Sequence, residues 1–193
     1  MSGGMTEQHM TEHGELLAVY EEHFTGDQSI ESRMKSFRGR TTFRTLVTGS
    51  RVFSRPDLVV DSLDILHAAC RVKRRRMVLR EGGCRRGPDK TAHDWGVEHG
   101  GLVTENRTPD MVILDTLRAP WEGSLGLGAG MARNTDMVDL GADVCLAFIE
   151  DESSGASDCA EKAEKAGIVT IFWRIDSGVL TMPPAGWGHL VPL

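Results

Sequence analysis

The 193-residue chain has no closely spaced cysteine pair, no apolar run long enough to cross a membrane and no excess of positive charge. Its four cysteines (Cys70, Cys84, Cys145 and Cys159) lie far apart, without a CxxC pair or a His-Cys cluster. This spacing argues against a zinc site or a disulfide framework and favours reduced cysteines. The N-terminus also lacks the basic-then-apolar order of a signal peptide. We therefore expect a cytoplasmic protein with no metal site and no membrane contact.

The charge balance argues against general nucleic-acid binding. The chain has 22 basic and 28 acidic residues, which gives a net charge of −6. A local basic patch stays open as an alternative, because Arg71–Arg76 form a basic run and Arg85, Arg86 and Lys90 follow it. The apolar fraction of 40% and the charged fraction of 26% are those of an ordinary globular protein. Nucleic acid is accordingly the least favoured partner.

The chain divides into three parts by composition. Residues 1–40 are rich in Glu, His and other polar residues, and we expect a partly helical or disordered N-terminal extension there. Residues 41–175 form the main domain, and residues 176–193 are expected to be an irregular closing segment. A role of the extension in binding a partner, or in forming a homo-oligomer, stays open.

Apolar segments alternate with helical patterns over residues 43–173. We predict strands at about 43–48, 77–79, 102–104, 143–149 and 168–173. Helices are predicted from Ser54 to about 72, from Pro88 to 99, around Arg133–Leu140, and over Cys159–Ala166. The apolar run Met111–Leu114 is not assigned: a strand extension, an edge strand and an insertion are all open. This alternation predicts an α/β fold with a mostly parallel central sheet.

Two loops of small polar residues follow predicted strands. Thr48–Arg51 follow the first strand, and Ser153–Ser157 follow the strand at 143–149. In a parallel sheet these loops share one edge, and ligands bind there where the strand order reverses. Glycine backbone and hydroxyl groups suit an anion. The two loops therefore predict a phosphate-binding site.

Four segments of the chain resemble the YspA-type branch of the SLOG superfamily, which is related to the LOG phosphoribohydrolases and to DprA. They are TLVTGSRVF (45–53), GGCRRGPDKTAHDW (82–95), AGMARNTDMVDLGADVCLAF (129–148) and SGASDCAEKAEKAGIVTI (154–171). The resemblance implies a Rossmann-like three-layer sandwich and a nucleotide-derived ligand such as a nucleoside monophosphate, ADP-ribose or NAD, with no required cofactor. The motif positions that would line the site are Gly49, Ser50, Arg51, Gly82, Gly83, Gly87, Asp89, Arg133, Asn134, Ser154, Gly155 and Ser157.

The residue types suggest a role for most of the motif positions. Gly49, Gly83 and Gly155 would let backbone N–H groups reach a phosphate. Ser50 and Ser157 would donate hydroxyl hydrogen bonds, and Arg51 and Arg133 would neutralise the phosphate charge. Asp89 and Asn134 suit a ribose or the edge of a base.

One departure from the resemblance bears on catalysis. Phosphoribohydrolase relatives carry a catalytic glutamate in the last loop, where this chain has Cys159, with Asp158 one position earlier. We therefore predict a binding protein that acts as a sensor or sequesters its ligand. A nucleotide hydrolase that uses Asp89 or Asp158 as its acid/base is the first alternative. The histidines His93 and His99 are expected to be structural or exposed.

Overall fold

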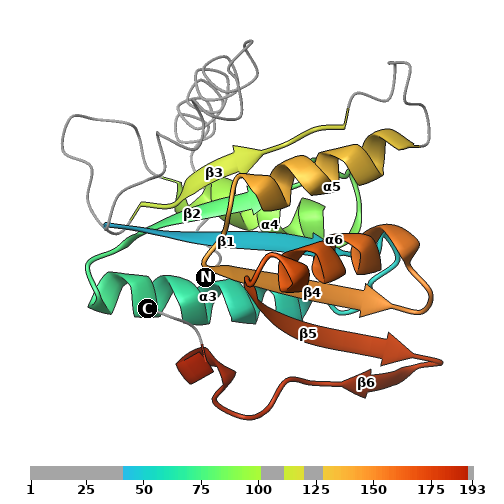
Figure 1. Ribbon diagram of the computed structural model, residues 1–193. Coiled ribbons are helices and arrows are strands. Elements are labelled where there is room, and N and C mark those ends of the chain that lie inside the picture. Colours follow the sequence, from blue (N-terminus) through green and yellow to red (C-terminus); the bar gives the residue numbers. More distant parts are fainter. Residues whose placement is uncertain (1–40, 101–110, 120–127, 191–193) are drawn as a thin grey trace, which may run out of the picture.

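The computed structural model describes residues 41–100, 111–119 and 128–190. The predicted extension at 1–40 and the predicted strand at 102–104 lie outside these ranges. The described chain alternates strands and helices in the predicted manner (Figure 1). The elements are β1 (Thr42–Gly49), α3 (Pro56–Val72), β2 (Arg76–Glu81), α4 (Gly87–His99), β3 (Ile113–Thr116), α5 (Ala129–Asp139), β4 (Val144–Glu150), α6 (Ser154–Lys165), β5 (Val169–Asp176), β6 (Val179–Thr181) and the 3-10 helix η2 (Trp187–Leu190).

The six strands form one sheet in the order β3-β2-β1-β4-β5-β6. All neighbours are parallel except β5 and β6. The chain winds from β1 through β2 to β3 in one direction and from β4 to β5 in the other. The strand order therefore reverses between β1 and β4, whose carboxyl ends lie side by side with Gly49 opposite Phe148. The predicted α/β fold is confirmed.

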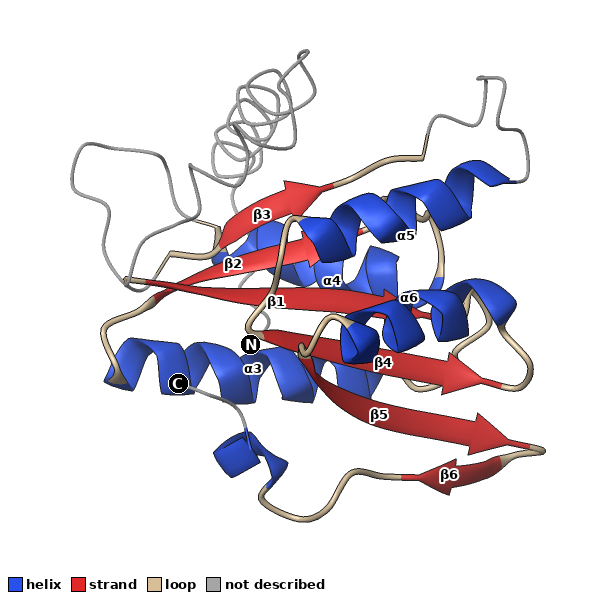
Figure 2. Ribbon diagram, in the orientation of Figure 1, coloured by secondary structure: helices blue, strands red, loops and turns tan. Residues whose placement is uncertain are grey.

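Helices cover both faces of the sheet (Figure 2). Helices α3 and α4 pack on one face over a core that includes Phe43, Val47 and Leu63. Helices α5 and α6 pack on the other face over Leu46, Met137 and Cys159. Strand β4 is buried on both sides, as its continuous apolar sequence predicted. This three-layer arrangement leaves the carboxyl edge of the sheet to the loops and the helix N-termini.

Two local predictions are corrected, and one assignment that the sequence left open is made. The unassigned run at Met111–Leu114 leads into strand β3, at the edge of the described sheet. Residues 154–157, expected to be part of a loop, form the first turn of α6, because the extended backbone of Ser153 lets the helix begin directly after it. Arg55, not Ser54, is the residue that precedes helix α3, and its side chain makes no capping hydrogen bond.

The closing segment is more regular than predicted over its described residues 176–190. Strand β6 pairs with β5 in an antiparallel hairpin. The turn consists of Ser177 and Gly178, both with positive φ (50° and 79°), as a two-residue hairpin turn of this kind requires. Trp187 then packs its ring edge-to-face on Trp173, with ring centroids 5.3 Å apart. The segment therefore extends the sheet and closes one side of its core.

The two basic runs lie at opposite ends of strand β2. Arg71–Arg76 connect α3 to the start of β2, whereas Arg85 and Arg86 follow the end of β2. A six-residue strand separates them, which corresponds to about 17–20 Å. The structure therefore does not support a single basic patch over residues 71–90.

Candidate functional site

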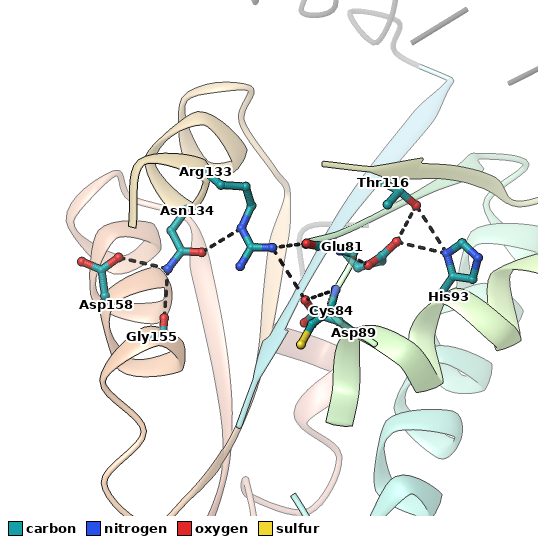
Figure 3. Close-up of polar contacts among 11 residues, drawn as sticks. Glu81, Cys84, Asp89, His93, Thr116, Arg133, Asn134, Gly155 and Asp158 are labelled. Carbon is teal, nitrogen blue, oxygen red and sulfur yellow. Dashed lines mark hydrogen bonds and ion pairs between the residues drawn. The ribbon is translucent and has the colours of Figure 1, made fainter. Parts of the chain in front are cut away.

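Polar side chains from four elements meet at the carboxyl edge of the sheet (Figure 3). Gly82 follows β2, Asp89 lies in the first turn of α4, and Arg133 and Asn134 lie on α5. Gly155 and Asp158 come from the first turns of α6. Figure 3 shows them as a continuous network from the glycine loop after β2 to the start of α6. These predicted site residues, far apart in sequence, are thus brought together.

Arg133 lies at the centre of this network. Its Nη1 donates a hydrogen bond to the Gly82 carbonyl and lies 3.9 Å from Asp89 Oδ2. Its Nε donates to the Asn134 side-chain oxygen over 3.2 Å. A Cβ atom on Gly82 would overlap the guanidinium and would lie 2.8 Å from Asp89 Oδ2. The absence of a side chain at residue 82 therefore makes room for Arg133.

Asn134 joins α5 to α6. Its side-chain amide is buried and donates to the Gly155 carbonyl over 2.9 Å and to Asp158 Oδ2 over 3.0 Å. Asp158 also accepts from Lys162 Nζ over 2.8 Å. Asp158 is thus held by an amide and an ammonium group, which makes it a structural acceptor at this end of the site.

The glycine loop after β2 directs its N–H groups toward carboxylates of the protein itself. Gly83, in the left-handed conformation at φ +66°, donates its N–H to Glu81 Oε2 over 2.5 Å. Cys84 donates its N–H to Asp89 Oδ2 over 3.3 Å. The predicted role of the Gly83 N–H as a phosphate donor would thus require Glu81 to release it.

Asp89 is nearly buried and has an unusual protonation equilibrium. Burial, together with the nearby Glu81 carboxylate, raises the pKa of Asp89 to about 7. Arg133 and the N–H groups of Cys84 and Gly82 act in the opposite direction, because they stabilise the carboxylate. Asp89 therefore exchanges a proton near neutral pH, which is a property of functional carboxyl groups.

Glu81 is a member of the site that the sequence analysis missed. Its carboxylate is fully buried and accepts hydrogen bonds from Thr116 Oγ1 on β3, from the Gly83 N–H and from His93 Nδ1, the last over 3.2 Å. The hydrogen bond to Glu81 raises the pKa of His93. The only signal in the sequence is a charged residue at the junction of a buried strand and two glycines.

Three other predicted residues contribute to packing. The Ser50 hydroxyl donates to the Glu150 carbonyl and accepts from the Glu150 N–H, which ties the ends of β1 and β4 together. A Cβ atom on Gly49 would lie 2.7 Å from the Phe148 carbonyl oxygen, and one on Gly87 would overlap the Ser50 carbonyl oxygen. The hydroxyl of Ser50, predicted to bind phosphate, is therefore already used within the protein.

The remaining predicted residues lie at the surface of the same edge. Arg51 is exposed in the turn after β1, and Ser154 and Gly155 are exposed at the start of α6, with Ser157 partly buried. The first turn of α6 contains no acidic residue, unlike the first turns of α3 and α4, which carry Asp57 and Asp89; none of the three helices has a side-chain cap. The N-terminal dipole of α6 is therefore available to an anion.

Cys159, which the resemblance led us to expect at the position of a catalytic glutamate, lies on α6. It is buried, and burial raises the pKa of its thiol to about 11 in spite of a hydrogen bond with the Thr48 side chain. The thiol is thus neutral and faces β1. It cannot serve as a carboxylate or as a thiolate near neutral pH.

Two features are absent from the described ranges. No group of three or more His, Cys, Asp or Glu residues there is placed to hold a metal ion. No helix within those ranges is long and apolar enough to cross a membrane.

The chain is similar in sequence to known proteins. The family model described as "YspA, cpYpsA-related SLOG family" matches residues 43–111. The Gene 61 protein of Mycobacterium phage D29 is 41% identical over 131 residues, which cover 66% of this chain and 94% of the phage protein. No solved structure matches the chain. On the family model, the phage relative and the Rossmann-like strand order together, the chain belongs to the YspA, cpYpsA-related SLOG family.

Proposed function

We propose that this protein binds a nucleotide-derived small molecule at the carboxyl edge of its sheet and acts as a sensor or sequesters the ligand. The observation that carries the proposal is the convergence of Arg133, Asn134 and the start of α6 at the point where the strand order reverses. Ligands of open α/β sheets bind at this point. A nucleoside monophosphate, ADP-ribose or NAD has the mixture of phosphate and hydroxyl groups that such a site would recognise.

The start of α6 is the proposed position of the phosphate. Its first turn offers backbone N–H groups, the Ser154 hydroxyl and Gly155, around which a Cβ atom would meet nothing within 4 Å. Arg51 follows the neighbouring strand β1 and supplies positive charge at the same edge. Helix N-termini and arginine together favour a phosphate group.

Calorimetry with AMP, ADP-ribose, NAD and cyclic nucleotides tests this function. We expect at least one of them to bind the wild-type protein. The variant Gly155→Asp should abolish that binding, because it places a carboxylate in the first turn of α6 where the phosphate would lie. An aspartate in a first helical turn favours the helix, so the fold should be retained.

Gly155→Asn is the matched control, since it adds the same volume without the charge. It should weaken binding much less than Gly155→Asp. If no nucleotide binds the wild-type protein, the proposed function is wrong. If Gly155→Asp binds as well as the wild-type protein, the phosphate does not lie at α6.

A nucleotide hydrolase is the second candidate, and the protonation of Asp89 favours it. A carboxyl group with a pKa of about 7 can donate a proton to a leaving group near neutral pH. Asp158 suits this role less, because Lys162 and Asn134 hold its carboxylate. Release of free base or ribose phosphate by the wild-type protein, lost in Asp89→Asn and kept in Asp158→Asn, would support an enzyme. Absence of both products would exclude this candidate.

A further inference from the structure

The N-termini of helices α4 and α6 both lie at the carboxyl ends of the strands, and they differ in charge. Helix α6 begins without an acidic residue, whereas the first turn of α4 contains the nearly buried Asp89. The glycine loop that precedes α4 has the composition of an anion cradle. The N–H groups of Gly82, Gly83 and Cys84, however, already have partners within the protein.

Three of the groups that could bind an anion at this loop converge on Asp89. The Cys84 N–H donates to Asp89 Oδ2 over 3.3 Å, and the Gly82 N–H also stabilises the Asp89 carboxylate. Arg133 Nη1 lies 3.9 Å from the same oxygen. Two backbone amides and a guanidinium are the donors that a phosphate oxygen would use. The Asp89 carboxyl therefore occupies the position of a bound oxyanion.

From this arrangement we infer that Asp89 is a specificity-determining residue, which fills the anion position of the glycine loop and so directs the phosphate of the ligand to the α6 side. The loop then offers carboxyl oxygens, which accept hydrogen bonds from the hydroxyl or amino groups of a ligand. The ligand would bind in one orientation, with its phosphate near Gly155 and its hydroxyl-bearing end near Asp89. This inference rests on the proposed function for its ligand, but the filled anion position does not.

An oxyanion probe tests the filled position without any nucleotide. We choose inorganic sulfate, because it has the tetrahedral shape of phosphate and its charge stays constant near neutral pH. In ¹⁵N-labelled wild-type protein at about pH 8, where Asp89 is ionised, sulfate should leave the backbone amide signals of Gly82 and Cys84 unchanged. In Asp89→Ala, these signals should shift. Sulfate affinity measured at them should rise by about tenfold or more, which corresponds to about 1.4 kcal/mol.

The matched control is Asp94→Ala. Asp94 lies on the same helix, is exposed and pairs with Lys90, so this variant removes the same charge away from the loop. It should respond to sulfate as the wild-type protein does. If Asp89→Ala retains its fold and its Gly82 and Cys84 signals still ignore sulfate, the inference is wrong.

A second variant covers the case in which Asp89→Ala fails to fold. Asp89 faces Glu81 from β2, Arg133 from α5, the Cys84 backbone in the loop and the neutral Cys159 thiol from α6. Ionisation of Asp89 should therefore repel sulfate from the loop. The Cys84 signal of the wild-type protein, which should not respond to sulfate at about pH 8, should begin to respond weakly as the pH falls toward about 6, because Asp89 loses its charge over this interval. In the isosteric Asp89→Asn the response to sulfate should change much less with pH. The same pH profile in both proteins would overturn the inference.

These outcomes separate the inference from the proposed function. If no nucleotide binds but sulfate reaches Cys84 in Asp89→Ala, the anion position is established and the proposed function fails. If nucleotides bind but Asp89→Ala gains no sulfate site, the function stands and the assignment of Asp89 is wrong.

Discussion

The Asn134 side-chain amide lies 3.0 Å from Asp158 Oδ2 and connects the two helices that cover one face of the sheet. The same amide donates to the Gly155 carbonyl, at the start of α6. Because the proposed phosphate position depends on where α6 begins, this pair of residues positions the site as well as stabilising the fold.

Replacement of Asn134 by alanine should therefore affect both stability and binding. The buried acceptors would lose their donor, at a cost of about 1–3 kcal/mol in the free energy of unfolding. Urea denaturation measures this cost, and calorimetry measures the accompanying loss of nucleotide affinity. Thr135→Ala is the control, because its hydroxyl is exposed and bonds only within α5. Equal stability of the two variants would contradict the structural role of Asn134.

The ion pair between Arg80 and Asp115 holds strands β2 and β3 together beneath the site. Arg80 Nε lies 2.8 Å from Asp115 Oδ2, and both side chains are at most 2% exposed. Asp115→Ala leaves a buried guanidinium without its carboxylate and should cost about 3–5 kcal/mol in the free energy of unfolding. The double variant Arg80→Met, Asp115→Leu should recover much of this loss, since no uncompensated charge remains. A double variant less stable than Asp115→Ala would contradict this account.

Gly49 is closely packed against its neighbours, whereas Gly155 lies in open space at the proposed phosphate position. Alanine at residue 49 would press its Cβ atom against Pro88 and to within 2.7 Å of the Phe148 carbonyl oxygen, so we expect a loss of about 1–3 kcal/mol. Alanine at residue 155 would meet nothing within 4 Å and should leave the melting temperature unchanged or raise it. Thermal unfolding of the two variants checks this. A stable Gly49→Ala protein would contradict the close packing of α4 against β1.

The sequence predicted the layers of the fold well, because strand and helix periodicity are local properties. It also predicted that Asp89, Arg133, Asn134 and Gly155 would meet, because parallel strands bring their carboxyl ends to one edge. It did not predict the partners of these residues. The hydrogen bonds of Glu81 with Thr116 and the Gly83 N–H depend on how β2, β3 and α4 pack, which no local pattern specifies.

For Ser50, the sequence predicted a ligand-binding role, but the structure shows a role in packing. Its position after a strand, between glycine and arginine, is typical of a ligand-binding hydroxyl. In the structure the hydroxyl bonds the Glu150 backbone on the neighbouring strand β4, 100 residues away in sequence. Only the pairing of β1 with β4 reveals that this serine is a structural link.

The Glu81–His93 pair predicts a pH-dependent stability. The hydrogen bond to Glu81 raises the pKa of His93 in the folded protein above its ordinary value of 6.5. The protonated imidazole therefore contributes stability that is fully present below about pH 6.5 and is lost as the pH rises through the folded pKa. In His93→Gln this part of the pH dependence should disappear. Urea denaturation at several pH values between about 5 and 9 measures it, and an unchanged profile in His93→Gln would exclude the coupling.

Asp89 should also make the folded protein less stable as the pH rises, but over a lower pH range than His93. Its pKa is raised from 3.8 to about 7 on folding. The folded state then binds more protons than the unfolded state in this interval, and stability falls as the pH rises from about 4 to 7.

Asp89→Asn keeps the shape of the side chain and cannot ionise. Its stability relative to the wild-type protein should therefore increase steadily over that interval and level off above about pH 7. A constant difference between Asp89→Asn and the wild-type protein would mean that Asp89 is ionised throughout. The glycine loop would then hold a permanent negative charge, and the site would exclude anions from that loop at every pH near neutrality.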